Sequence, residues 1–122
     1  MLKSYRELQV WQRSIQLAAA VYRLAASFPR DEIYGLSSQM KRAAVSVASN
    51  IAEGYGRLTG GEYRQFLGIA RGSVLELQTQ FEISRALEFG DGTRLNEAEA
   101  LSEEVSKMLY TMIDKMKATK AN

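Results

Sequence analysis

The chain contains no cysteine and no histidine among its 122 residues. Without cysteine there is no disulfide framework, no thiolate nucleophile and no cysteine-ligated metal. Without histidine the chain lacks the commonest general base and the commonest metal ligand, and Ser-His and Cys-His dyads are excluded. An enzyme would have to work with Asp, Glu, Lys, Arg, Tyr and Ser alone. We therefore expect a non-enzymatic protein with no catalytic residue, no metal site and no cofactor.

Proline and long apolar runs are also scarce. Pro29 is the single proline, and the chain is rich in Ala, Leu, Gln, Glu, Arg and Met, which favour helices. No run of about 18 apolar residues occurs, so we expect no membrane span and no membrane partner. The N-terminal sequence MLKSYRELQVW is charged and lacks the apolar core of a signal peptide. Together with the absence of cysteine, this favours a cytoplasmic protein.

Four helical segments are predicted in one domain spanning residues 1–122. Their expected ranges are about 5–27, 36–53, 60–89 and 95–117. Ser4 with Glu7, and Thr59 with Glu62, have the spacing of capping boxes at the first and third helices. Short connectors between successive helices favour antiparallel neighbours. The sequence therefore predicts an all-α fold, an antiparallel up-down four-helix bundle.

The first helix carries two apolar stripes, whereas one stripe is enough for the core of a bundle. One stripe consists of Leu8, Trp11, Ile15, Ala18, Tyr22 and Ala25, and the other of Val10, Leu17, Val21, Leu24 and Phe28. The surplus apolar surface needs a cover, which either a capping connector or a second subunit would supply. We favour the second subunit, so the sequence predicts a homo-oligomer.

The second and third helices contain many small residues. The second reads AAVSVAS over residues 43–49, and the third has Gly68 and Gly72 one turn apart. A glycine inside a helix costs about 1 kcal/mol relative to alanine. Because small residues let helix backbones approach closely, this pattern predicts a tight helix contact at the two glycines.

The stretch SNIAEGYGR at residues 49–57 contains the end of a narrow polar face on the second helix. That face is formed by Gln39, Arg42, Ser46, Asn50 and Glu53. On the third helix, Glu76 is a further carboxylate within a largely apolar run. One interpretation is an active or metal site with Glu53 and Glu76 as a carboxylate pair. The other is a structural polar network whose members satisfy one another. We favour the network, because bundle di-iron sites also use histidine and no aspartate-rich loop is present to hold Mg²⁺ or Ca²⁺.

The segment EGYGR within that stretch has two glycines, a feature of phosphate-binding loops. It lacks the pattern G-x-x-x-x-G-K-[ST] and follows no predicted strand, so a Walker loop is excluded. Gly54 and Gly56 are better explained as a helix stop followed by a tight turn. Tyr55 either stacks on a base or packs against a neighbouring helix, and we favour packing.

Positive charge is concentrated in the first part of the chain. Residues 1–72 hold ten Lys and Arg against five Asp and Glu, whereas residues 73–122 hold six against nine. A solvated helical cation usually has an acid three or four residues away. Seven cations have none at those spacings, namely Arg6, Arg13, Arg23, Lys41, Arg42, Arg64 and Arg71. They need partners in tertiary space: acids on another helix, another subunit, or phosphates.

Four of the basic residues are candidates for binding RNA or DNA, and they are Lys41, Arg57, Arg64 and Arg71. Arg64 and Arg71 lie seven residues apart on one side of the third helix, about 10 Å along its axis, and Arg57 precedes them. A symmetric oligomer would repeat such a patch around its axis and would bind nucleic acid in a salt-sensitive way. The alternative is a structural or protein-interaction scaffold in which these cations form intersubunit ion pairs.

Four motifs taken together resemble one family. They are L-x-V-W in the first helix, FP-x-x-E-x-YGL after it, Q-x-x-RA-x-x-S-x-x-SNIAEG in the second helix and IA-x-GS-x-x-EL-x-T in the third. The combination is similar to the bacterial four-helix-bundle proteins encoded within intervening sequences of 23S ribosomal RNA genes. The similarity covers residues 5–89 closely and the fourth helix loosely.

The resemblance implies an all-α protein without enzymatic activity that assembles as a five-fold ring of bundles. A related protein, the accessory variability determinant of diversity-generating retroelements, binds a reverse transcriptase and nucleic acid through a basic surface. The partners implied here are therefore further copies of the chain, in a homopentamer, and RNA, DNA or a reverse transcriptase-like protein. The family motif positions, which we interpret as architectural, are Gln39, Arg42, Ser46, Asn50, Glu53, Gly54, Gly72, Ser73 and Glu76.

Overall fold

The computed structural model describes residues 3–121, with side chains described as far as residue 117. Its four long helices are α1 (Gln9–Ala25), α2 (Leu36–Tyr55), α3 (Gly60–Leu87) and α4 (Gly92–Ala121). Two short 3-10 turns, η1 (Tyr5–Glu7) and η2 (Arg30–Tyr34), precede α1 and α2. Over the described range there is no strand, so the predicted all-α class is confirmed.

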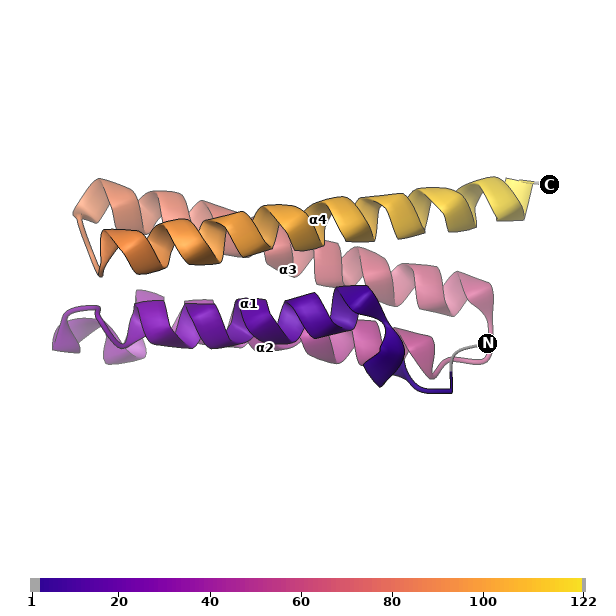
Figure 1. Cartoon of the computed structure of the whole chain (residues 1–122), viewed down its shortest axis with the longest axis horizontal. Coiled ribbons are helices and arrows are strands. Elements are labelled where there is room, and N and C mark those ends of the chain that lie inside the picture. Colours follow the sequence, from indigo (N-terminus) through magenta and orange to yellow (C-terminus); the bar gives the residue numbers. More distant parts are fainter. Residues whose placement is uncertain (1–2, 122) are drawn as a thin grey trace.

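The helices pack as a closed cycle of neighbours. α1 contacts α2 and α4, and α3 contacts the same two helices. In Figure 1 the four helices lie along a common axis, with the α1–α2 and α3–α4 connectors at one end and the α2–α3 connector at the other. At the first end the two connectors touch: the rings of Phe28 and Phe89 are 5.7 Å apart, and Asp91 N–H donates to Ser27 Oγ at 2.9 Å. In the described residues, no helix has the length and apolarity needed to cross a membrane.

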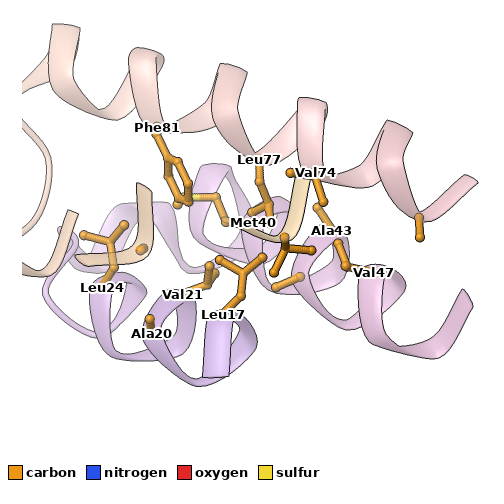
Figure 2. Close-up of a cluster of buried hydrophobic side chains, with 14 of the residues drawn as sticks. Leu17, Ala20, Val21, Leu24, Met40, Ala43, Val47, Val74, Leu77 and Phe81 are labelled. Carbon is orange, nitrogen blue, oxygen red and sulfur yellow. The ribbon is translucent and has the colours of Figure 1, made fainter. Parts of the chain in front are cut away.

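The core runs along the middle of the bundle and draws on all four helices. Figure 2 shows Leu17 and Leu24 of α1, Met40 of α2, and Leu77 and Phe81 of α3 converging on it. Leu95, Ala98, Val105 and Leu109 supply the α4 side. A buried apolar side chain of this size stabilises the fold by about 1.5–3 kcal/mol relative to an exposed one. The four helices are thus held mainly by side chains that repeat at helical spacing.

The two apolar stripes of α1 have different environments. Leu17, Val21 and Leu24 of one stripe are fully buried, whereas Ile15 and Tyr22 of the other are 44% and 46% exposed. Ile33 of the η2 connector lines the same surface groove as Tyr22 but is itself 58% exposed. The connector therefore leaves Ile15 and Tyr22 partly in solvent within a single chain, whereas Leu8, Trp11 and Ala18 of the same stripe pack against the core.

The first and fourth helices differ from their predicted ranges at the N-terminal end. The Ser4 hydroxyl accepts the Arg6 N–H at 3.1 Å, as a cap should, but it caps η1 and not a long helix. Leu8 is extended, with φ −71° and ψ 125°, so α1 begins only at Gln9. Conversely, α4 begins at Gly92, three residues earlier than predicted, because the Asp91 carboxylate accepts the Arg94 N–H at 3.0 Å.

Most other helix ends lie close to their predicted positions, but α4 continues to Ala121, four residues past the predicted end at residue 117. α1 ends at Ala25 instead of residue 27, and α3 ends at Leu87 instead of residue 89. The Thr59 hydroxyl accepts the Glu62 N–H at 3.1 Å and caps α3 as the sequence predicts. α2 continues past residue 53 to Tyr55, so Gly54 lies inside the helix and does not stop it.

Gly54 lies where α2 and α3 approach closely, whereas Gly68 and Gly72 lie at no such contact among the described residues. A Cβ added at Gly54 would lie 2.7 Å from the Phe66 Cβ of α3, which explains why only glycine fits at the α2–α3 contact. A Cβ added at Gly68 or Gly72 would meet nothing within 4 Å. Among the described residues, Gly68 and Gly72 therefore do not make the tight contact predicted for them, and they face open space on the outer side of α3.

Candidate nucleic-acid interface

Two of the cations that lack an acid on their own helix find one on α4. Arg13 Nε lies 2.9 Å from Glu104 Oε1, and Arg23 Nη2 lies 3.5 Å from Glu97 Oε1. These pairs join α1 to α4 and offset both charges. Their side chains are about half exposed, so each pair contributes at most about 1 kcal/mol to stability.

Three more of these cations lie over tyrosine rings. The distances to the ring centroids are 4.9 Å for Arg6 Cζ over Tyr5, 5.2 Å for Lys41 Nζ over Tyr22 and 5.6 Å for Arg71 Cζ over Tyr110. A cation over a ring face is held in position by the quadrupole of the ring, but its charge is not neutralised. Such a side chain is positioned in advance for an anion.

Arg64 and Arg71 are the strongest candidates on α3. Their Nε atoms are buried, without a hydrogen-bond partner among the described residues, and neither guanidinium belongs to an ion pair in that part of the chain. The seven-residue spacing places both on the same side of the helix. Arg71 contacts Tyr110 of α4, so this side borders the α3–α4 junction.

Arg57 and Lys41, the other two candidates, lie apart from that pair. Arg57 Nη2 is 3.1 Å from Glu53 Oε1, and its guanidinium carbon lies 4.5 Å from the centroid of the Phe66 ring. Its charge is therefore offset locally. Lys41 lines a groove between α1 and α2. The four candidates thus do not form one continuous patch, because they divide between the α1–α2 side, the α2–α3 turn and the α3–α4 side.

The polar face of α2 forms hydrogen bonds to α3 in its middle portion. Ser46 Oγ is 2.9 Å from Ser73 Oγ across the helix junction, and Asn50 Nδ2 donates to Ser46 O at 2.8 Å and to Ser46 Oγ at 3.0 Å. Gln39, Arg42 and Glu76 line a groove that also includes Ser46 and Ser73. The arrangement holds α2 against α3 by short side-chain contacts.

Glu53 lies outside this polar groove, which differs from the sequence-based expectation. Its carboxylate is turned to Arg57, whereas Glu76 accepts a hydrogen bond from Gln80 Nε2 at 3.4 Å. In the described residues, no group of three acidic side chains comes together as a metal site requires. Glu53 and Glu76 therefore have different partners, Arg57 and Gln80.

Among the described residues, Tyr63 and Arg85 have shifted pKa values, and both belong to structural contacts. Burial raises the pKa of Tyr63, and the neighbouring Tyr55 raises it further. The two rings meet edge to face with centroids 6.0 Å apart, so Tyr55 packs on α3. The pKa of Arg85 is raised first by its hydrogen bond to Glu99. Both arrangements keep these groups in their ordinary charge state at neutral pH.

Sequence reasoning missed two residues of α4 beside Arg71. Tyr110 is 58% exposed, and Lys107 lines the same cleft. Lys107 has Glu103 and Glu104 nearby in sequence, yet Glu104 is paired with Arg13, and Lys107 is in none of the ion pairs between described residues. The available signal was the position of Tyr110, an aromatic residue lying off the apolar stripe of its helix.

Comparison with known proteins supports the fold and identifies the family. The family model described as 23S rRNA-intervening sequence protein matches residues 6–111. A solved structure from Bacteroides thetaiotaomicron, described as a protein of unknown function from the S23 ribosomal protein family, has a TM-score of 0.76 and 20% sequence identity. The match covers 85% of this chain and 97% of that one. A comparison with curated proteins finds no significant match. Because the family model spans most of its length, the chain belongs to the family of 23S rRNA-intervening sequence proteins.

Proposed function

We propose that the protein is a non-enzymatic, cytoplasmic, ring-forming bundle that binds nucleic acid, or a nucleoprotein partner, through the basic side of α3. The observation that carries the proposal is that Arg64 and Arg71 lack ion-pair partners within the described part of the chain. Their guanidinium groups have no acid partner among the described residues, whereas Arg13 and Arg23 are paired with α4. A surface with two arginines that lack a counter-charge is better suited to binding a polyanion than to facing solvent alone.

Assembly would strengthen a weak site. The alternating connectors of Figure 1 support an up-down antiparallel bundle, and we propose that five copies form a closed ring. Each copy would contribute its own Arg64 and Arg71, so a long nucleic acid would contact several pairs at once. Multivalent contact raises the overall affinity without any new interaction at a single site.

Fluorescence anisotropy with labelled RNA tests the proposal. We expect a hairpin RNA to bind with a dissociation constant in the micromolar range or below at about 50 mM salt. The affinity should fall steeply toward about 200 mM salt, because released counterions dominate such binding. Duplex DNA of equal length serves as a comparison. Failure of both ligands to bind at 50 mM salt would contradict the proposed function.

A protein-interaction scaffold is the second candidate, and an apolar surface on α3 favours it. Ile69, Ile83 and Leu87, which share one side of the helix, are between 43% and 54% exposed. Gly68 and Gly72 lie on the same helix with open space above them. Exposed aliphatic residues beside glycines suit close packing of another helix, and a second copy of the chain is the partner that we propose.

Replacing apolar residues of this surface with charged residues should dissociate the oligomer. We expect Ile69→Glu with Ile83→Glu to reduce the mass measured by size-exclusion chromatography with light scattering to that of one chain, 13.6 kDa. The two residues are about four helical turns apart on one side of α3, and both side chains are partly exposed, so the helix should remain folded. Tyr34→Glu with Leu58→Glu makes the same charge change at connector residues that are 94% and 99% exposed, and should leave the assembly intact. An unchanged mass for the α3 variant would show that α3 is not the interface.

A further inference from the structure

A cleft between α3 and α4 combines the two kinds of group that single-stranded nucleic acid binds. Arg71 comes from α3, and Lys107 and Tyr110 come from α4. Tyr110 is 58% exposed, and the Arg71 guanidinium carbon lies 5.6 Å from the centroid of its ring. The cleft therefore places an accessible aromatic surface next to two cations.

The charge balance of the cleft is positive. Glu103 is the carboxylate that lines it with Arg71 and Lys107. Glu104 follows directly in sequence, but its carboxylate is 2.9 Å from Arg13 Nε on α1. Neither Arg71 nor Lys107 belongs to an ion pair within the described part of the chain. One carboxylate thus faces two cations, which leaves net attraction for an anion.

Arg71 is also held in place before any ligand arrives. Its Nε is buried, so the terminal nitrogens are the donors that remain for a ligand, and the Tyr110 ring supports the guanidinium. A planar guanidinium fixed in this way loses little conformational freedom when it binds a phosphate. On the opposite side of the cleft, the Thr111 hydroxyl donates to Lys107 O at 3.0 Å, which ties two lining residues together within α4.

We propose that this cleft binds an unpaired nucleotide, with the base stacked on Tyr110 and the flanking phosphates contacted by Arg71 and Lys107. The inference rests on the proposed function and narrows it from nucleic acid in general to single strands. In a duplex the bases stack on one another and cannot reach a side-chain ring, whereas an unpaired base can. The cleft should consequently prefer single-stranded RNA to double-stranded RNA.

Anisotropy with a labelled 12-nucleotide oligouridylate and a 12-base-pair RNA duplex, both at low salt, tests this preference. Tyr110→Ala is expected to weaken binding of the single strand by about 5- to 150-fold, the range for losing one stacked base. Tyr110→Leu, which keeps an apolar side chain without an aromatic face, should show the same loss, and Tyr110→Phe should retain affinity. For all three variants, the affinity for the duplex should stay within about twofold of that of the unmodified protein. Tyr34→Ala removes a tyrosine that is 94% exposed on η2 and serves as the matched control.

The outcomes separate this inference from the function on which it rests. If Tyr110→Ala and Tyr110→Leu bind the single strand as the unmodified protein does, the stacking site is wrong although nucleic-acid binding stands. An equal loss for single strand and duplex would also overturn it, because stacking acts on unpaired bases alone. If the unmodified protein binds neither ligand at low salt, the proposed function fails and the inference fails with it.

Discussion

Replacing Arg64 and Arg71 together with glutamate should lower the affinity for RNA by at least about a hundredfold. Each arginine is expected to make charge-assisted hydrogen bonds to phosphate, and one such bond contributes roughly 1.5–3 kcal/mol. The substituted glutamates would in addition repel the same phosphates. Removal of two phosphate contacts should also reduce the slope of log affinity against log salt by about 1.4 for a single strand. Anisotropy titrations at four salt concentrations measure both effects.

The control for this experiment is a pair of cations at the other end of the bundle. Arg30 lies in η2 and Arg94 in the first turn of α4, and both are exposed. Arg30→Glu with Arg94→Glu changes the net charge by the same amount as the α3 variant. If the binding surface is local to α3, the loss of RNA affinity in this control should be smaller than the loss in the α3 variant by about tenfold or more. Equal losses would mean that net charge and not position governs the affinity.

The same α3 variant also separates the two candidate functions. If its RNA affinity is unchanged, Arg64 and Arg71 are not the binding site. If the variant falls apart on a sizing column while the Arg30 and Arg94 control stays assembled, the arginines serve ion pairs between subunits, as the scaffold function requires. Retained assembly with lost RNA binding is the result that we expect.

The helices could be predicted from the sequence because the signals involved are local. Composition and apolar spacing show α1 to α4, and the Thr59 cap follows from its own capping box. The missed boundaries depend on equally local details: an extended Leu8 interrupts the first helix, and Asp91 caps the fourth earlier than the apolar pattern begins. At such helix ends, capping residues predict the boundary better than apolar periodicity does.

The candidate site was harder to predict, because its state depends on which helices are neighbours. Arg13 and Arg71 look alike in sequence, since neither has an acid one turn away. The packing of α1 on α4 gives Arg13 a carboxylate at 2.9 Å, whereas α4 offers Arg71 the ring of Tyr110. Gly68 and Gly72 misled for the same reason: small residues indicate a close approach but do not identify what approaches. In both cases the environment of the residue depends on which groups of the neighbouring helix lie opposite it.

Gly90 in the α3–α4 connector is expected to be highly sensitive to substitution by alanine. Its φ is +81°, in the left-handed region that costs other residues about 1–2 kcal/mol. A Cβ at this position would lie 2.8 Å from Phe28 Cε1 and 3.1 Å from Leu24 Cδ1, and such overpacking costs about 1–3 kcal/mol. Gly90→Ala should therefore lower the free energy of unfolding by about 2–5 kcal/mol, measured by urea denaturation at a fixed protein concentration.

Gly92 provides the control within the same connector sequence. It is the first residue of α4, and a Cβ there would meet nothing within 4 Å. Gly92→Ala should therefore change the free energy of unfolding by less than about 0.5 kcal/mol, or raise it slightly through better helix propensity. The contrast matters because Phe28 also packs on Phe89, so Gly90 lets the α3–α4 connector close over the α1–α2 connector. If both alanine variants are equally stable, Phe28 moves aside without cost, and the contact between the connectors does not hold this end of the bundle together.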